Sequence, residues 1–490
     1  MDIKHKKLAG FAIDECRVFV REETLSLWNA IEHTVQLNQN LRISGPPGTG
    51  KSTEAWAWAC WKARESKKKV VWFHFSKNRS TKVVIDGSLD FKQITTGYSA
   101  NIEDINKCSD GDFLVVDGVT KTESINISRA CSAWRETCPD RVFVIVTSVS
   151  IPIPLQDDEE ADINLHEVPS WTLEQYQLAC NDIPFYDSVK HNLNTPECIP
   201  VENKDDCILS KYFYAGGCAR WMFEFNMERF QKDFESHFQK VDNFKDVYVQ
   251  GGGDQKADAV NHLRGLTIRH NEKNYFFISQ YATRRLSSKC DNARQFIIDG
   301  YNKADQTGNP SFRGWIFEFD VDYQLRQANS NKEMLLVSIR SNQINQPDQE
   351  EKWTVDQYVT FKSTDELLSL LKVISADQHL WVKPNLWCQK AYDFLHFYKH
   401  AGDLVMVAVN ASHAKKHAVL LSELYNLGRK LALQDSSVTS IAFRFVVPSG
   451  EKFEVGNIEG RLDDWKWPPT KSLMIDQSHI AIANIVRTLI

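Results

Sequence analysis

The eight residues GPPGTGKS, at positions 45–52, constrain the fold of this 490-residue chain more than any other feature. An apolar stretch at 41–44 precedes them, and a segment rich in apolar residues, TEAWAWACWKARE, follows them. A loop of the form G-x-x-x-x-G-K-[ST] between a strand and a helix surrounds phosphate groups with its backbone amides. The motif therefore predicts a strand, a phosphate-binding loop and a helix within an α/β sheet.

Each residue type in the motif has a separate task in binding a nucleotide. Lys51 is expected to meet the β- and γ-phosphate oxygens, and Ser52 to offer its hydroxyl to Mg²⁺. Asp117 ends the apolar stretch FLVVDG and is expected to supply the second magnesium carboxylate. The predicted ligand is ATP or GTP with Mg²⁺. The tight loop needs its three glycines, Gly45, Gly48 and Gly50.

The surrounding pattern alternates strands with helices, which is typical of a parallel sheet. A polar segment between the second and third strands has room for a hairpin. After Pro152, one more strand and a helix beginning near Ser170 or Thr172 are expected, and YAGGCARWMFEF predicts a glycine turn that opens a helix. This later part is expected to form a small helical lid. Strands are predicted at 41–44, 69–75, 113–118 and 141–148, and helices at 22–38 and 124–137.

Hydrolysis by such a site requires a group that orients water. Gly118 follows Asp117, where many ATPases with an inserted strand carry a glutamate. Slow turnover, or a base from elsewhere, is therefore expected. Thr147 or Ser148 is a candidate contact for the γ-phosphate. Arg220 in GGCAR is a candidate sensor that couples the lid to the nucleotide.

The length predicts about three folded units. The second α/β region is expected to contain a helix at 312–327, strands at 333–340 and 353–361, a helix at 364–374, a strand at 403–410, a helix at 413–433 and a strand at 440–448. A polar, glycine-rich break at 249–258 predicts a flexible joint. The expected division is a P-loop core at 1–155, a helical lid and sensor region at 156–250, a connector at 251–309 and a C-terminal domain at 310–490.

Composition excludes several classes of protein. Hydrophobic residues make up 42% and charged residues 25%, which is typical of globular proteins and excludes disordered and collagen-like chains. The formal net charge of -6 removes the simplest nucleic-acid signature, a strongly basic chain. The 11 cysteines include no C-x-x-C pair, so reduced thiols are expected. No apolar run approaches the roughly 20 residues that span a bilayer, and no signal peptide is evident. We expect a cytoplasmic or nuclear protein, unless it is exported by an unconventional route.

Several of these segments together resemble the Crinkler family of secreted effectors, whose architecture is shared with the retrotransposon hot spot proteins of trypanosomes. They are GPPGTGKST, the helix AWAWACW, the strand LVVDG, the segment SWTLEQYQLA and the lid YAGGCARWMFEF. The resemblance implies a P-loop NTPase sheet with a helical lid, followed by a restriction-endonuclease-like α/β domain. It also implies secretion and action on DNA in the host nucleus, causing DNA damage or cell death, with host nuclear proteins as further partners. NTPases of this class often form homo-oligomers. The ubiquitin-like header with its LFLAK-type motif is missing from the first residues.

The resemblance also implies a metal-dependent nuclease site in the C-terminal domain. Restriction-type nucleases use a helix glutamate, an aspartate that begins a strand, and an acidic or amide residue before a lysine on the next strand. Glu318 in GWIFEFDVDYQL and Asp393 in CQKAYDFLHF match the family's glutamate and aspartate, and Asp393 would bind the metal. The family's Q-x-T and downstream histidine correspond to Asn410, Ser412 and His417 in NASHAKKH.

A second metal chemistry fits the same stretch. His396 and His400, and again His413 and His417, stand four apart, as on one face of a helix. In an HNH-type site, His400, Asn410 and His417 would act as base, orienting group and ligand.

Short basic clusters supply local positive charge. They lie at 4–7 (KHKK), a weak nuclear import signal, at 67–69, and at Lys415 and Lys416. The last pair is a candidate for phosphate binding, or for the ammonium group that a restriction-type site requires.

Three functions compete at this stage. The first is an effector in which nucleotide binding controls a DNA-cleaving domain. The second is a nucleotide-dependent DNA- or protein-binding switch with an inactive nuclease fold, suggested by Gly118 and by NAS in place of Q-x-T. The third is an anti-phage or chaperone-like ATPase whose C-terminal domain recognises protein, which suits the acidic net charge.

Overall fold

The chain forms two compact units, Met1–Cys290 and Asp291–Ile490. The second unit begins with a helix that lies in the predicted connector, ahead of position 310. The structure is a computed structural model, and it describes residues 2–3, 16–76, 79–87, 91–96, 103–108, 111–119, 123–148, 162–196, 203–248, 257–270, 272–287, 289–290, 292–332, 334–341, 349–385, 391–400, 402–414, 416–433, 438–448, 453–459 and 480–485.

The first unit is built on a seven-stranded sheet in the order β6-β5-β4-β7-β8-β3-β9. The five strands from β4 to β9 in this order run parallel, and β5 and β6 add an antiparallel hairpin at one edge. The predicted parallel α/β sheet and the predicted hairpin are confirmed. The strands are β3 (Asn40–Ser44), β4 (Val70–Ser76), β5 (Arg79–Ile85), β6 (Phe91–Thr96), β7 (Phe113–Val119), β8 (Val142–Thr147) and β9 (Ile163–Glu167).

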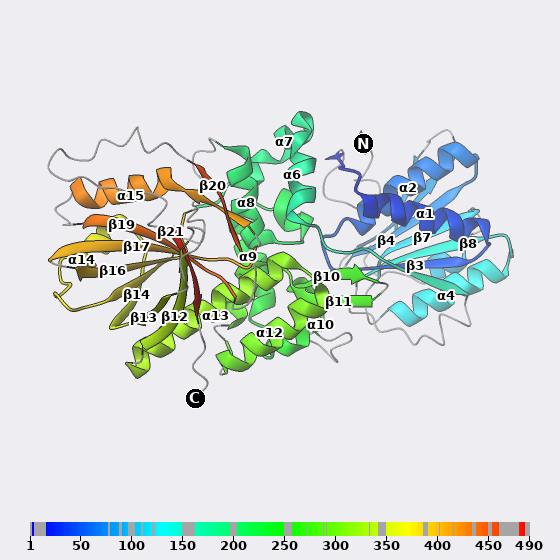
Figure 1. Cartoon of the computed structure of the whole chain (residues 1–490). Helices are drawn as coiled ribbons and strands as arrows, with labels where there is room; N and C mark the ends of the chain where they lie inside the picture. Colours follow the sequence, from blue (N-terminus) through cyan, green and yellow to red (C-terminus); the bar gives the residue numbers. More distant parts are fainter. Residues whose placement is uncertain are drawn as a thin grey trace. The chain divides into compact units, whose positions relative to one another are not determined.

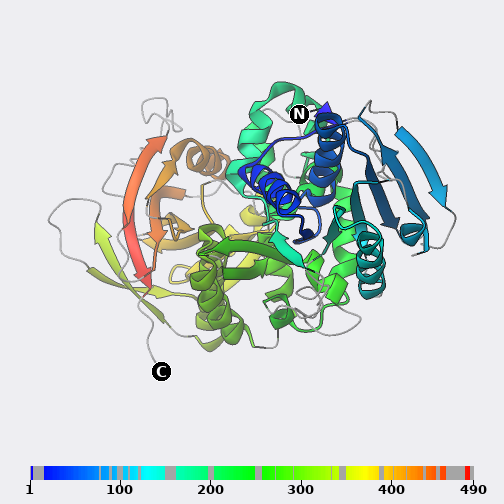
Figure 2. The ribbon, with the colours of Figure 1, turned by 90° about the vertical axis from the view of Figure 1, so that its right-hand side faces the viewer.

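Helices cover both faces of this sheet because its central strands are apolar on both sides. Along β4, Trp72 joins the core beneath α1 (Glu22–Gln36) and α2 (Lys51–Ser66), and Phe73 joins the core beneath α4 (Ser124–Glu136). Figures 1 and 2 show α1 and α2 on one face of the sheet and α4 on the other. The α2 helix therefore lies on the same face of the sheet as α1, opposite α4.

A group of mostly helical elements follows β9. Thr172 caps the first of these helices by accepting a hydrogen bond from the Gln175 N–H at 3.3 Å, which confirms the expected helix start. A hairpin of β10 (Arg264–Arg269) and β11 (Glu272–Phe277) interrupts a stretch that was expected to be helical. The helices are α6 (Leu173–Asn181), α7 (Ile183–Val189), α8 (Lys204–Ala215), α9 (Met227–Phe238), α10 (Ala257–His262) and α11 (Gln280–Ser287). Shorter pieces are β1 (Asp2–Ile3), β2 (Cys16–Arg17), α3 (Glu103–Asn106), η1 (Lys190–Asn192), η2 (Arg220–Glu224) and η3 (Phe244–Val247).

The second unit contains an eight-stranded mixed sheet in the order β13-β12-β21-β19-β17-β16-β15-β14. Within it, β15, β16 and β17 form an antiparallel meander, and β17 pairs in parallel with β19. A separate two-stranded sheet pairs β18 with β20. The strands are β12 (Met334–Ser341), β13 (Gln349–Thr354), β14 (Gln357–Phe361), β15 (Leu380–Pro384), β16 (Phe394–His400), β17 (Asp403–Ala411), β18 (Lys416–Leu420), β19 (Val438–Val446), β20 (Glu454–Glu459) and β21 (Ile480–Ile485).

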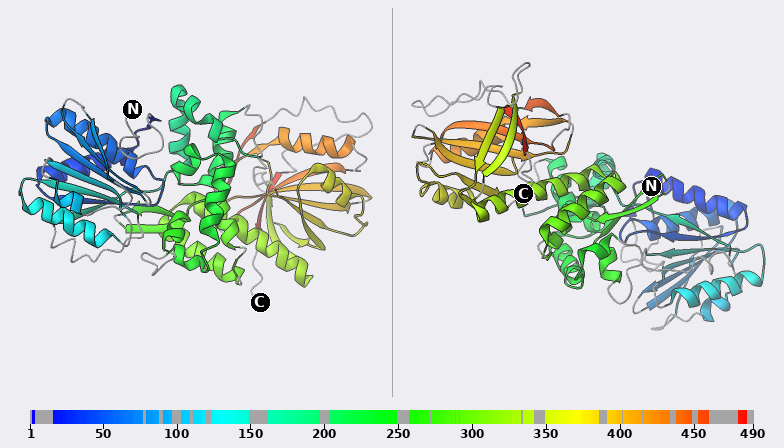
Figure 3. Two further views of the ribbon diagram at one scale, coloured as in Figure 1. Left: turned by 180° about the vertical axis from the view of Figure 1, so that it is seen from behind. Right: turned by 60° about the horizontal axis from the view of Figure 1, so that its bottom comes forward.

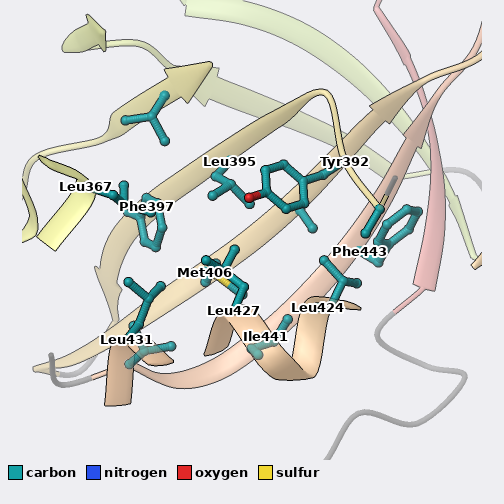
Figure 4. Close-up of a cluster of buried hydrophobic side chains, with 14 of the residues drawn as sticks. Leu367, Tyr392, Leu395, Phe397, Met406, Leu424, Leu427, Leu431, Ile441 and Phe443 are labelled. Carbon is teal, nitrogen blue, oxygen red and sulfur yellow. The ribbon is translucent and has the colours of Figure 1, made fainter. Parts of the chain in front are cut away.

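Helices again lie on both faces of the larger sheet (Figures 1 and 3). Asn309 caps α13 (Pro310–Asn331), and Pro310 occupies the first helical turn, where its missing N–H costs nothing. This helix packs on one face beside α12 (Ala293–Thr307). The other face is covered by α14 (Thr364–Leu371) and α15 (Leu421–Leu433), and Figure 4 shows the apolar core between α15 and the sheet.

Three expectations for the second unit are wrong. The segment at 353–361 is not one strand, because the chain turns after Thr354 and begins β14 at Gln357. The helix expected at 413–433 begins only at Leu421, because Lys416–Leu420 forms β18 and pairs with the distant β20. The approach to Asp393 contains the unexpected strand β15. The joint at 249–256, the cluster at 4–7 and Lys415 lie outside the described residues.

Substitution of Leu395 by alanine is expected to destabilise the second unit. This side chain is fully buried in the core drawn in Figure 4, and truncating a buried leucine costs about 2–5 kcal/mol. Urea unfolding followed by tryptophan fluorescence measures the change. Val373→Ala is the control, because Val373 is exposed in the same unit. Equal stability of the two variants would contradict the packing described here.

Candidate functional site

The GPPGTGKS loop joins the carboxyl end of β3 to the first residue of α2, Lys51. Gly48 lies at its centre with φ +77°, and a Cβ there would come within 2.3 Å of Cys218 Sγ. A side chain at position 48 would therefore be strained and would displace the segment Gly216–Arg220. The close approach of this segment is therefore a second reason for glycine at position 48, beside the tight turn that the loop makes.

The Lys51 side chain folds back over the loop. Its Nζ donates hydrogen bonds to Gly45 O at 2.8 Å and to Pro46 O at 2.7 Å. Burial lowers the pKa of Lys51 to about 7, with Arg220 acting in the same direction and Asp117 in the opposite one. An anion beside Nζ would favour the charged form, so this ammonium group is suited to a phosphate ligand.

Ser52 and Asp117 meet at the carboxyl edge of the sheet. The Ser52 hydroxyl donates to Asp117 Oδ1 at 2.7 Å, and Asp117 is buried. The other carboxylate oxygen, Oδ2, lies 2.8 Å from His74 Nδ1. Hydroxyl and carboxylate oxygens are hard ligands of the kind Mg²⁺ prefers, so the donor set of Ser52 and Asp117 fits this ion. The structure thus brings together the two predicted magnesium ligands.

Gly118 adopts φ +76°, and the β7·β8 register shifts between Val116 and Val119. A Cβ on Gly118 would lie 2.1 Å from Phe75 O in the adjacent strand β4. The missing glutamate is therefore a steric consequence of how β7 ends against β4, because no side chain fits at this position.

The segment Gly216–Arg220 contacts the GPPGTGKS loop directly. The Arg220 N–H donates to Gly48 O at 3.3 Å, and Trp171 Nε1 donates to Thr49 O at 3.0 Å. Arg21 Nη2 donates to the same Thr49 carbonyl at 3.0 Å, and its guanidinium stacks on Trp171. The Arg220 side chain itself is half exposed, with Nε 4.0 Å from Glu224 Oε2. The contact of Arg220 with the loop is therefore made by its backbone.

The two γ-phosphate candidates at the end of β8 differ in environment. Thr147 is buried, and its hydroxyl donates to Ile43 O at 3.3 Å. Ser148 is the first residue after the strand and is half-buried.

In the second unit, Glu318 belongs to a buried carboxylate and lysine cluster. Lys383 Nζ lies 3.5 Å from Glu318 Oε1 and 3.5 Å from Asp322 Oδ2. Tyr358 OH and Arg326 Nε donate to Asp322 Oδ1, the latter at 3.3 Å. Burial raises the pKa of Asp322, but Lys383, Arg326 and Tyr358 together outweigh it, and the net pKa is lowered. Lys383 and Asp322 were not predicted as site residues.

Asp393 and Asn410 lie where β16 begins and β17 ends. The Asp393 N–H donates to Val409 O at 2.8 Å, and its Oδ2 accepts from the Ala411 N–H at 2.8 Å. The aspartate therefore precedes a strand, as a restriction-type site requires, and its carboxylate extends the β16·β17 ladder.

The sheet separates the predicted nuclease residues. Side chains alternate along β17, so the buried Asn410 shares the face of Ala408, which packs toward α14 and α15. Lys383 shares the α13 face with Trp381. Glu318 pairs with Lys383 and so lies on the face opposite Asn410. The His417 ring contacts Phe445 in the core on the α14 and α15 face. The structure therefore groups Glu318 with Lys383, not with Asn410 or His417.

The HNH-type interpretation is wrong in its geometry. His396 and His400 lie on the strand β16, and His417 lies on β18, so their spacing is not helical. His400 pairs with Asp403, seven residues before Asn410 along β17. At about 3.3 Å per residue, roughly 20 Å separates the two positions. His413 precedes β18 and accepts a hydrogen bond from Arg313 Nε.

Across the described ranges of the chain, no three or more His, Cys, Asp and Glu side chains are arranged as a metal-binding group. Within the same ranges, no helix is both long and apolar enough to cross a bilayer.

The chain matches no protein-family model, and no curated protein matches it.

Replacing Lys383 with methionine is expected to destabilise the second unit at neutral pH by about 3 kcal/mol, because it leaves two buried carboxylates without their shared cation. The pKa of Asp322 is lower in the folded protein than its ordinary value of 3.8, so the ionised carboxylate stabilises the fold at pH values above 3.8. This contribution is lost as the pH falls from 3.8 through the lowered pKa. The difference from wild type should therefore shrink below about pH 4.

Urea unfolding between pH 3 and 7 measures this effect. Lys362→Met, at an exposed lysine in the same unit, is the matched control. A Lys383→Met difference that stays constant across this range would argue against the cluster.

Proposed function

We propose that the first unit binds a nucleoside triphosphate, ATP or GTP, together with Mg²⁺, and hydrolyses it. The observation that carries this proposal is the set formed by Lys51, Ser52 and Asp117 beside the GPPGTGKS loop. Each of these residues has the chemistry that one part of a magnesium triphosphate requires.

The strand order supports the same conclusion. The loop follows β3, and β8 lies between β3 and the Asp117 strand β7. This is the arrangement of P-loop ATPases with an inserted strand. The candidate ligands lie at the carboxyl ends of parallel strands, where α/β sheets bind their ligands.

Each group at the site would bind a different part of the magnesium triphosphate. Backbone amides of the loop and of the first turn of α2 bind phosphate oxygens, aided by the positive end of that helix. Lys51 neutralises charge on the β- and γ-phosphates. Ser52 and Asp117 would hold Mg²⁺, which supplies electrostatic stabilisation of the charge that develops on the phosphates.

The same geometry suggests how nucleotide binding would affect the lid. The Arg220 and Trp171 N–H groups donate to carbonyls of Gly48 and Thr49. A phosphate that reorients the loop would therefore change hydrogen bonds to the segment Gly216–Arg220. Coupling between the phosphate loop and the lid needs no further contact.

Lys51→Ala is expected to weaken the binding of a fluorescent ATP or GTP analogue in Mg²⁺ by roughly 10-fold or more, because the charge-assisted hydrogen bonds to phosphate are lost. Equilibrium titration measures the dissociation constant. Lys232→Ala, at an exposed lysine on α9, should bind as wild type does. Tight binding by Lys51→Ala would refute the assigned site.

A second candidate function is metal-dependent cleavage of DNA by the second unit. The succession α13, β15, β16, β17, α15 and β19 favours it, because Asp393 immediately precedes the middle strand of the meander. Lys383 Nζ lies 5.1 Å from the Phe394 ring centroid, near the start of that strand, which adds Lys383 to Lys416 on β18 as a candidate for the required ammonium group. Against it, Glu318 and Asn410 lie on opposite faces. The rival function is a nucleotide-dependent DNA- or protein-binding switch with an inactive nuclease fold.

Incubation of the full chain with plasmid DNA and Mg²⁺ or Mn²⁺, with and without ATP, distinguishes these functions. Gel electrophoresis measures nicking of the plasmid and any gel shift. If the second unit is a nuclease, Asp393→Asn should lower nicking by roughly 100-fold, because the metal loses a charged ligand. The amide oxygen can still accept from the Ala411 N–H, so the variant should fold. Cleavage unchanged in Asp393→Asn would reject this site, and intact plasmid with a gel shift in wild type would favour the binding switch.

A further inference from the structure

The proposed NTPase site has no side chain at the usual position of the residue that orients water. Gly118 is closed to any side chain by Phe75 O. For the proposed hydrolysis, a group that positions water would come from another element at the same edge of the sheet.

His74 occupies a suitable place. It lies at the carboxyl end of β4, and the parallel β4·β7 register sets it directly beside Asp117. Trp72, two residues earlier, packs on the α2 face, so His74 projects toward the side from which α2 presents Ser52. The His74 side chain is 18% exposed, against 2% for Asp117. It is therefore the more solvent-accessible member of the pair.

The hydrogen bond to Asp117 sets the chemical form of the ring. A carboxylate oxygen 2.8 Å from His74 Nδ1 accepts a hydrogen bond from the N–H of that nitrogen. In the neutral ring with a proton on Nδ1, Nε2 carries the lone pair that accepts hydrogen bonds. The Ser52 hydroxyl donates to the other oxygen of Asp117, so the carboxylate that aims the ring is itself held in place.

Neighbouring side chains are less suited to this task. The Arg220 guanidinium has donors only, and it cannot accept a hydrogen bond from water. The Thr147 hydroxyl is engaged with Ile43 O. His74 combines an acceptor nitrogen, a fixed orientation and partial exposure.

We propose that His74 is a catalytic residue of the first unit, which orients the water that attacks the γ-phosphate. This rests on the proposed NTPase function. Water donates a hydrogen bond to Nε2 while its oxygen forms a bond to the γ-phosphorus. The bond from that phosphorus to the bridging oxygen breaks, and its electron pair stays with the nucleoside diphosphate. The proton of the water passes to an oxygen of the departing phosphate and then to solvent.

The test compares His74→Ala and His74→Gln with wild type and with His33→Ala, which removes an exposed histidine from α1 of the same unit. Two quantities are measured in the full chain with Mg²⁺. They are the dissociation constant of a fluorescent non-hydrolysable nucleotide and the kcat for phosphate release.

We expect His74→Ala to keep its nucleotide affinity and to lose roughly 100-fold in kcat. His74→Gln should retain an intermediate rate, because its amide oxygen can accept a hydrogen bond from water. His33→Ala should match wild type in both quantities.

The outcomes separate this proposal from the proposed function. Unchanged kcat in His74→Ala, loss of nucleotide binding together with kcat, or a wild type that binds nucleotide without hydrolysing it would each overturn the role of His74. Failure of the wild type to bind nucleotide would instead overturn the NTPase proposal itself.

Discussion

The hydrogen bond from the Ser52 hydroxyl to Asp117 is the interaction on which the first unit's site depends. It joins the first turn of α2 to the end of β7, two elements that are far apart in sequence. The bond exists because β3 and β7 run parallel and end at the same edge of the sheet. The apolar faces of α2 and β4, which bury Trp56 and Trp72 completely, fix that arrangement. Packing of the core therefore sets the geometry of the proposed phosphate site.

The same loop also contacts the segment Gly216–Arg220. The Gly48 carbonyl accepts a hydrogen bond from the Arg220 N–H, and the Thr49 carbonyl accepts hydrogen bonds from Trp171 Nε1 and Arg21 Nη2. A ligand that changes the loop must act on these bonds. The glycine at position 48 serves this contact, because Cys218 Sγ leaves no room for a side chain.

Much of the first unit could be predicted from sequence because its signals are local. The glycine loop, the apolar strands and the Thr172 cap each depend on neighbouring residues. The second unit was less predictable, since β18 owes its form to the distant strand β20. Site residues divide in the same way. Lys51, Ser52 and Asp117 follow from motifs, whereas His74 and Lys383 depend on strand register and on the α13 contact. The separation of Glu318 from Asn410 depends on which face each strand residue takes, and that too is settled only by the fold.

Hydrogen exchange with and without Mg²⁺ and ATP would test the central claim most directly. If triphosphate binds the loop and the loop is coupled to the lid, amides at 45–52 and at 216–220 should both exchange more slowly in the presence of nucleotide, while amides of the second sheet provide an internal reference. If saturating nucleotide slows exchange in neither segment, the account is contradicted.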